Sequence, residues 1–170
     1  ETGKLTLARK PRPFPGGEDK KRSVSFEDRA RKSRYDFLLS VMGKYGARKL
    51  LVGHTADDQV ETVLMRIQQG SGISGLKGIP RITERGVERP LLDIWKKDIL
   101  AYLKKHRIPY RVDRSNLDTR FERNWIRHVL LPLLEKRYGK SVRKRIHALG
   151  ERFRELDAYI EHNEIGRAHV

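Results

Sequence analysis

The 170-residue sequence contains no cysteine. This absence excludes disulfide bonds, thiolate-held zinc and cysteine-ligated iron–sulfur clusters from the chain itself. Long apolar runs are also missing, since none approaches the roughly 18 residues of a membrane-spanning helix. Glu1 opens the chain without a charged-then-apolar signal segment. We therefore predict a cytoplasmic protein without membrane association.

Acidic residues are scarce relative to basic ones. Lys and Arg together number 38 against 22 Asp and Glu, which gives a net charge of +16 at pH 7. Such an excess favours an anionic partner, and nucleic acid is the commonest large one. A solvated basic surface without a partner is the alternative. Hydrophobic residues make up 37% of the chain, which is enough for a packed core.

The spacing of apolar residues predicts an α/β fold. Helices are expected to begin at Ser25, near Ala56 and after a cap at Asp93, and to cover about 122–138 and 140–163. Short strands are expected at 4–9, 49–52 and 108–112, with a proline- and glycine-rich loop at 10–24. This order indicates a mainly parallel sheet with flanking helices.

Three details of these elements are also predicted. The strand at 49–52 should be buried. Pro132 should kink the fourth helix, because proline removes a backbone donor. The last helix should bury a coiled-coil-like seam made of Val142, Ile146, Leu149, Phe153, Leu156 and Ile160.

An acidic turn follows the second predicted strand. It reads Gly53-His54-Thr55-Ala56-Asp57-Asp58-Gln59-Val60-Glu61-Thr62. In open α/β sheets, the carboxyl ends of the strands form the crevice where ligands bind. Asp58 and Glu61 are three residues apart, and Asp57 and Glu61 are four apart, so both pairs can share a helix face. Such carboxylates can hold Mg²⁺ beside phosphates or bind an ammonium group. Alternatively, they simply cap the helix and complement its dipole.

The acidic turn resembles the second signature of the PP-loop ATPases, in the form carried by tRNA(Ile)-lysidine synthetases. Further matches follow in the order of that family and span about residues 26–135. They are Ala30-Arg31-x-x-Arg34-Tyr35-x-Phe37-Leu38, Arg66-x-x-x-Gly70-Ser71-Gly72-x-x-Gly75-Leu76-x-Gly78, Arg89-Pro90-Leu91-Leu92 as the next strand, Asp113-x-Ser115-Asn116, and Arg123-Asn124-x-Ile126-Arg127-His128-x-Leu130-Leu131-Pro132. Any one of them is a modest signal, but their shared order is specific.

The resemblance implies an ATP-dependent ligase that acts on tRNA. Enzymes of this family adenylate the C2 carbonyl oxygen of the wobble cytidine in an isoleucine tRNA. The ε-amine of free L-lysine then displaces AMP and gives lysidine. The implied partners are tRNA(Ile), lysine and ATP, with Mg²⁺ as a candidate cofactor, and a homodimer is left open.

The resemblance also assigns roles to residues of this chain. Asp58 and Glu61 are expected to bind lysine and to form the catalytic set with Arg127. One of the two carboxylates could also serve as the base that deprotonates the lysine amine. His54, Asp57 and Arg123 are expected beside the nucleotide, with Asp57 as the candidate Mg²⁺ ligand. His54 by itself is weak evidence, because single histidines are often structural.

Arg123 and Arg127 are four residues apart on the fourth predicted helix, with Arg120 one turn earlier. The planar guanidinium suits phosphate or carboxylate groups. Both arginines are therefore expected to bind substrate, and the triphosphate, the lysine carboxylate and the tRNA backbone all stay open as the anion bound. A solvated basic face is the alternative. Asn116 could contact the substrate or cap a turn, and the cap is favoured.

The family's first signature, Ser-Gly-Gly-x-Asp-Ser, is absent from this sequence. In the family, its backbone N–H groups cradle the pyrophosphate. Pro15-Gly16-Gly17-Glu18-Asp19-Lys20 is a decoy, because no strand precedes it and no hydroxyl flanks it. Residues 1–135 are therefore expected to be the C-terminal part of a PP-loop ATPase domain that does not catalyse ligation by itself.

The remaining residues are expected to lie outside that domain. Residues 136–163 should form a helical connector towards a missing substrate-binding domain. Residues 164–170 resemble a translated sequencing adapter and are expected to be a non-native tail.

Two other functions compete with this interpretation. A PP-loop tRNA thiolase is the first, although such enzymes commonly use cysteines and this chain has none. A non-catalytic basic module that binds nucleic acid is the second. It explains the charge but leaves the acidic turn unexplained, because carboxylates repel phosphate.

Overall fold

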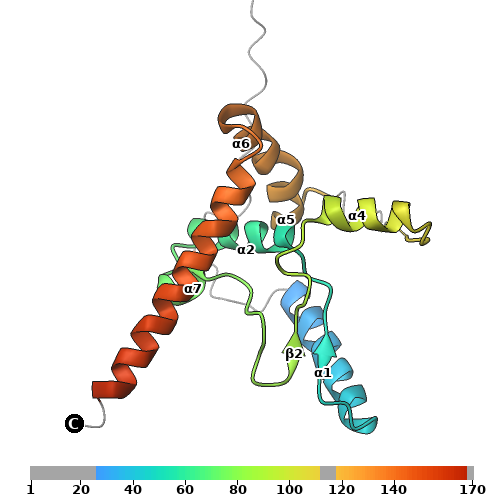
Figure 1. Cartoon of the computed structure of the whole chain (residues 1–170), viewed down its shortest axis with the longest axis vertical. Coiled ribbons are helices and arrows are strands. Elements are labelled where there is room, and N and C mark those ends of the chain that lie inside the picture. The colour runs from blue at the N-terminus through green and yellow to red at the C-terminus, as the bar shows by residue number, and fades with distance from the viewer. Residues whose placement is uncertain (1–25, 112–117, 168–170) are drawn as a thin grey trace, which may run out of the picture. The chain divides into compact units, whose positions relative to one another are not determined.

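The computed structural model describes residues 26–111 and 118–167, with side chains over 29–111 and 118–163 (Figure 1). The chain divides into two compact units, with the boundary between Gly46 and Ala47 in the sequence. The predicted strand at 4–9, the loop at 10–24, Asn116 and the last three residues lie outside the described residues. The predicted α/β class is confirmed, with a small parallel sheet among many helices.

The first unit contributes one described helix, α1 (Phe26–Lys44). The helix ends before Gly46, which adopts a φ of 61° that glycine accepts without strain. The apolar residues of the helix are only partly buried. Leu38 and Val41 are half-buried, but Phe37 and Tyr45 are 65% and 76% exposed. Within its own unit, the helix has no second described element on which to bury them.

The second unit contains a two-stranded parallel sheet. Strand β1 (Leu50–Leu51) pairs with β2 (Val87–Glu88), with Leu50 opposite Val87. The strand predicted at 49–52 is thus present but short. Its predicted burial is wrong, because Leu51 is 63% exposed on this narrow sheet. No strand forms over the described part of 108–112, residues 108–111.

The motif at 89–92 is not a strand but the turn that follows β2. Pro90 lacks the N–H group that would continue a sheet ladder. The turn folds back towards the start of the acidic helix, where the Ala56 N–H donates to the Ile94 carbonyl at 3.0 Å. The ligand-binding edge predicted from the sequence is therefore bordered by this turn.

Helix α2 (Ala56–Gln68) carries the acidic turn at its start. The glycine-rich segment after it contains a short helix that the sequence did not predict, α3 (Ile73–Leu76). Gln59 on α2 is fully buried and holds the end of this segment. Its amide donates to the Lys77 carbonyl at 2.9 Å and accepts from the Ile79 N–H at 2.7 Å. Gly78 lies so close to Gln59 that a Cβ there would sit 2.6 Å from the amide oxygen.

Helix α4 (Lys96–Lys105) begins later than a cap at Asp93 would require. The predicted cap is wrong, because the Asp93 carboxylate instead binds Arg81. The helix start is capped across the fold, since the Asp57 carboxylate accepts the Lys96 N–H at 2.8 Å. Tyr102 on this helix is 58% exposed.

The predicted fourth helix consists of three continuous pieces: α5 (Glu122–Trp125), the π-helix η2 (Ile126–Leu130) and α6 (Leu131–Tyr138). Pro132 lies in the first turn of α6, directly after the π-helical turn. A proline ring clashes with the carbonyl four residues earlier, and the wider π turn relieves that crowding. The predicted irregularity at Pro132 therefore takes the form of a π-helical segment.

Helix α7 (Val142–Arg167) packs against α2 and α3 within the second unit (Figure 1). Its predicted seam is partly wrong, because Leu149 and Leu156 are 37% and 42% exposed. Val142 is buried as predicted, but further along the helix the buried positions are offset by one residue, at Gly150 and Asp157. A Cβ at Gly150 would lie 3.0 Å from a methyl group of Val63, so α7 approaches α2 most closely at this glycine.

The core of the second unit forms between α2 and the segment from α5 to α6. Buried Val60, Leu64, Ile126 and Leu131 make its centre. Both tryptophans, Trp95 and Trp125, pack against it. Among the described helices, none combines the length and apolar character needed to cross a membrane. The core thus fixes the acidic end of α2 against η2, which carries Arg127.

Candidate functional site

A pocket of about 470 Å³ opens at the start of α2. Its lining brings together Asp57, Asp58, Glu61 and Arg127, which the sequence predicted as site residues. The remaining lining residues are Gly53, Thr55, Leu91, Lys96, Ile99, Leu100 and Arg143. The acidic turn after β1 therefore faces a cleft, as the α/β pattern predicted.

Asp58 caps the helix on which it lies. One of its oxygens, Oδ2, accepts the Thr55 N–H at 2.9 Å and the Thr55 hydroxyl at 2.8 Å. These bonds satisfy donors that a helix start leaves free. The other oxygen, Oδ1, lies 3.4 Å from Nη2 of Arg127. The capping alternative is thus correct for half of this carboxylate, while Oδ1 is turned towards Arg127.

Glu61 and Arg127 form a bidentate ion pair in the wall of the pocket. The two bonds measure 2.6 Å from Nε to Oε1 and 2.8 Å from Nη2 to Oε2. The Glu61 side chain is fully buried, whereas that of Arg127 is 22% exposed. Burial raises the pKa of Glu61 above its ordinary value, and the hydrogen bonds and charge of Arg127 offset only part of this rise. Burial lowers the pKa of Arg127, but the hydrogen bonds and charge of Glu61 and the nearby aspartates outweigh it, so this pKa is raised.

Asp57 connects the pocket to two further helices. Its Oδ2 caps α4 through the Lys96 N–H, and its Oδ1 lies 3.2 Å from Nη1 of Arg143 on α7. Arg143 in turn donates from Nε to the Glu135 carboxylate at 2.7 Å. Burial lowers the pKa of Arg143, but the Glu135 and Asp57 carboxylates outweigh it and raise this pKa overall. Asp57 therefore uses both oxygens within the fold.

Among the described residues, Arg123 and His54 are not part of the pocket lining. Arg123 lies behind the pair of Glu61 and Arg127, where its Nη2 donates to the Thr62 hydroxyl at 3.0 Å. Its guanidinium also lies 3.9 Å from Glu61 and 4.0 Å from Asp58. His54 is half-buried directly before the capping Thr55. Asn116 lies outside the described residues.

Three carboxylates and three cations line the pocket, so its formal charge is balanced. Mg²⁺ takes one or two protein carboxylates beside phosphates and waters. Both Asp57 oxygens already accept hydrogen bonds, and the role of Asp57 as a Mg²⁺ ligand stays a prediction. Phosphate groups fit the cationic donors of Lys96, Arg127 and Arg143. The ammonium group of Lys96 forms no ion pair with any described residue.

Sequence reasoning missed Lys96 and Arg143 as pocket residues. Lys96 had a usable signal, because it opens the helix that follows the family motif at 89–92. Arg143 had none, since it reaches the acidic turn only through the packing of α7 on α2. The cap at Asp58 could also have been read from the sequence, because Thr55-x-x-Asp58 has the spacing of a capping box.

The architecture defines the class of protein to which the chain belongs. A parallel strand leads into an acidic helix start, and a turn from the neighbouring strand borders the resulting pocket. Residues 15–134 match the PP-loop domain family, which is more than half of the chain. The chain therefore belongs to the PP-loop family, and the recognition made from the acidic turn is confirmed.

The similar curated proteins are tRNA(Ile)-lysidine synthases. The chain is 36% identical to that of Clostridioides difficile over 138 residues, covering 81% of this chain and 30% of the relative. For Symbiobacterium thermophilum the identity is 41%, covering 78% of this chain and 28% of the relative. For the protein of Porphyromonas gingivalis the identity is 43%, covering 69% of this chain and 26% of the relative. The chain thus spans less than a third of the length of these relatives.

A solved structure has the same fold. The U34-tRNA thiolase NcsA from Methanococcus maripaludis, determined with its 4Fe–4S cluster, superposes with a TM-score of 0.56 at 21% identity. The match covers 84% of this chain and 49% of the thiolase chain. At this identity, the similarity establishes the fold alone.

Proposed function

We propose that this chain is part of an ATP-dependent ligase that attaches lysine to the C2 position of the wobble cytidine of tRNA(Ile). The observation that carries the proposal is the pocket in which Asp58 and Glu61 meet beside Arg127. The names of the relatives support the tRNA substrate and the family supports the use of ATP. The adenylated intermediate and the lysine substrate are part of the proposal.

Asp58 is the proposed ligand of the lysine ε-ammonium. Its Oδ2 is held by Thr55, which fixes the carboxylate in place. Its Oδ1 lies 3.4 Å from Arg127 and 4.0 Å from Arg123, both long contacts, and so retains capacity to accept a further bond. A charge-assisted hydrogen bond to this oxygen would position the amine at the pocket wall.

Glu61 is the proposed base that removes a proton from the lysine amine. A carboxylate whose pKa is raised accepts a proton more readily than an ordinary glutamate. Arg127 keeps this buried carboxylate ionised through its bidentate bonds. Arg127 can also turn towards an anionic substrate group, because part of its guanidinium is exposed. Its proposed role is therefore to hold Glu61 and to meet the substrate.

ATP supplies the adenylyl group that activates the wobble cytidine at its C2 carbonyl oxygen. Lys96, Arg127 and Arg143 are the residues of this pocket that fit its phosphates, and His54 and Arg123 lie close by as further nucleotide contacts. Asp57 positions Lys96 and Arg143 through its two oxygens. Its further role as a Mg²⁺ ligand beside the phosphates stays a prediction.

The test measures incorporation of radiolabelled lysine into a tRNA(Ile) transcript by the full-length protein that carries this chain. Incorporation should require ATP and no sulfur donor, which separates the ligase from a thiolase. Asp58→Asn should reduce incorporation at subsaturating lysine by about 10- to 100-fold, the value of one hydrogen bond to a charged group. Its tRNA affinity should be unchanged.

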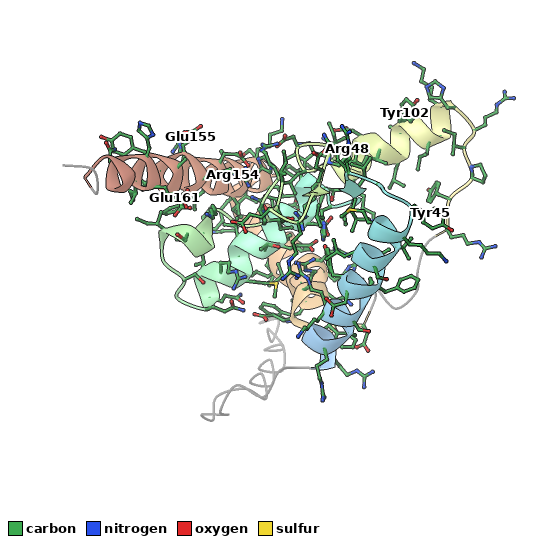
Figure 2. The ribbon with its side chains drawn as sticks, turned by 90° about the horizontal axis from the view of Figure 1, so that it is seen from below. Tyr45, Arg48, Tyr102, Arg154, Glu155 and Glu161 are labelled. Carbon is green, nitrogen blue, oxygen red and sulfur yellow. The ribbon has the colours of Figure 1, made fainter. Side chains whose placement is uncertain are left out.

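Glu155→Gln is the matched control, because Glu155 is an exposed carboxylate on α7 away from the pocket (Figure 2). This variant should incorporate lysine like the parent protein. Equal incorporation by Asp58→Asn and the parent would contradict the assignment of lysine to Asp58. A sulfur-dependent product would instead identify a thiolase.

A further inference from the structure

A basic arm extends from the pocket. We use this name for residues 97–111, which comprise α4 after its first residue and the segment that follows it. The inner end of α4 belongs to the pocket wall, through Lys96, Ile99 and Leu100. From there α4 reaches to one side of α2, and its side chains, including Tyr102, project outwards (Figures 1 and 2). At 1.5 Å per residue, the helix alone is about 15 Å long.

The charge of the basic arm is one-sided. Five cations stand against the single carboxylate of Asp98, and all are exposed. These cations are Lys97, Lys104, Lys105, Arg107 and Arg111. None of them forms an ion pair with any residue that the structure describes. The arm therefore carries an uncompensated positive field.

The arginines around the pocket differ from the cations of the arm, because they are paired. Arg123, Arg127 and Arg143 each face carboxylates of the site. Arg81 and Arg154 are likewise bound to carboxylates around α7. These five arginines are thus neutralised within the fold, whereas the arm leaves its five charges available to an external anion.

Helix electrostatics explains only part of this pattern. Cations in the last turn of a helix complement its dipole, which accounts for Lys104 and Lys105. Lys97 lies in the first turn, where a cation is disfavoured, and Arg107 and Arg111 lie beyond the helix. An anionic partner explains all five positions.

Aromatic rings accompany these charges. Tyr102 and Tyr110 are 58% and 54% exposed, and the Tyr102 ring lies 4.3 Å from that of His106. Unpaired RNA bases stack on exposed aromatic rings, and neighbouring cations hold the phosphates. An anionic membrane fits less well, because Ile99 and Leu100 line the pocket and are not free to enter a bilayer.

We propose that the basic arm binds RNA backbone and unpaired bases adjacent to the nucleotide that enters the pocket. This inference rests on the proposed function only in taking the RNA to be a tRNA. It does not depend on the lysine chemistry. Lysines of the arm hold phosphates, and Tyr102 offers a stacking surface for a base.

The test measures equilibrium binding of a fluorescent tRNA(Ile) transcript to the full chain at several salt concentrations, without ATP or lysine. The triple variant Lys97→Gln/Lys104→Gln/Lys105→Gln should weaken binding about 10-fold or more. It should also lower the slope of log affinity against log salt by about 2, because each lost phosphate contact removes roughly 0.7 to 0.9. Circular dichroism should show an unchanged fold, since all three lysines are exposed.

Lys136→Gln/Lys140→Gln/Lys144→Gln is the matched control. It removes the same charge from three exposed lysines of α6, α7 and the turn between them. This control should bind tRNA nearly as well as the parent chain. If both triple variants weaken binding equally, the effect is one of overall charge and the proposal fails. It also fails if the arm variant binds as the parent does.

Stacking is tested separately. Tyr102→Ala should weaken RNA binding about 5-fold or more, and Tyr102→Phe should retain it, because stacking needs the ring and not the hydroxyl. Tyr159→Ala, at an exposed tyrosine of α7, should have no effect. The last measurement is binding to vesicles of phosphatidylserine and phosphatidylcholine. Arm-dependent binding to these vesicles without RNA binding would overturn the proposal in favour of a membrane.

The outcomes separate this inference from the proposed ligase. Arm-dependent RNA binding without lysine incorporation would contradict the ligase proposal and still support the basic arm as an RNA site. Lysine incorporation and unchanged tRNA affinity in the arm variant would contradict only the proposal for the basic arm.

Discussion

Removal of the Arg127 guanidinium should leave the buried Glu61 carboxylate without a counter-charge. Glu61 is fully buried, and Arg127 supplies its two short hydrogen bonds. In Arg127→Met the carboxyl group avoids this cost by taking up a proton. At pH 7, protonation of a glutamate with an ordinary pKa of about 4.3 costs about 3.7 kcal/mol, at 1.36 kcal/mol per pH unit. We therefore expect a loss of about 3–4 kcal/mol, in the range measured for broken buried pairs.

The loss should depend on pH in a defined direction. In the variant, the folded-state pKa of Glu61 lies far above its unfolded value, so the folded state binds the extra proton. Stability relative to the parent should therefore fall as the pH rises through the raised pKa that Glu61 already has in the parent. The deficit should be smallest near pH 4 and should be clearly larger at pH 7.

Urea unfolding followed by tryptophan fluorescence measures this effect, because Trp95 and Trp125 both pack against the core. The double variant Glu61→Gln/Arg127→Met should recover about 2 kcal/mol or more at pH 7, since it removes the buried charge as well. A deficit below about 1 kcal/mol that does not change with pH would refute this reasoning. Strictly additive single and double variants would refute it as well.

Three further predictions concern the supports of the site. In the same urea assay, Gly78→Ala should destabilise the second unit by about 2 kcal/mol or more, because its φ of 72° is strained for alanine and the new Cβ would meet Gln59. Gly70→Ala is the control: its φ of 65° is also strained, but the space around it is open, so it should lose only about 1 kcal/mol. Asp57→Ala should cost about 0.5–2 kcal/mol by uncapping α4, and hydrogen exchange should show the loss first at the start of that helix. Asp157→Asn should lower the melting temperature more at pH 7 than at pH 3. The hydrogen bond from Lys77 lowers the pKa of Asp157, so its contribution is fully present above the unfolded pKa of about 3.9 and is lost progressively as the pH falls through the lower folded value. An equal loss at both pH values would contradict this.

The acidic turn could be predicted because its signals are local. Helical spacing alone places Asp57, Asp58 and Glu61 at the opening turn of one helix. The strand before this turn and the glycine after α1 follow from equally local rules. These features depend on neighbours a few residues away, so the order of residues is sufficient to find them.

The predictions that failed depended on distant neighbours. Asp93 has the chemistry of a cap, but Arg81 binds it and Asp57 caps α4 instead. Leu149 and Leu156 fit a seam by spacing, yet α7 meets α2 at Gly150, where a small residue permits close approach. The sequence contains the candidates for both roles but not the contact that selects between them.

The sequence by itself determined the family, the helix start that carries the three acids, and the excess of positive charge. Only the tertiary structure decided how those acids are partnered. Glu61 meets Arg127 across 66 positions of sequence, and Asp57 meets Arg143 across 86. The physical reason is that a buried carboxylate must find a donor wherever the packing of helices brings one, and that packing is set by the core formed between α2, η2 and α7 rather than by the residues beside each acid.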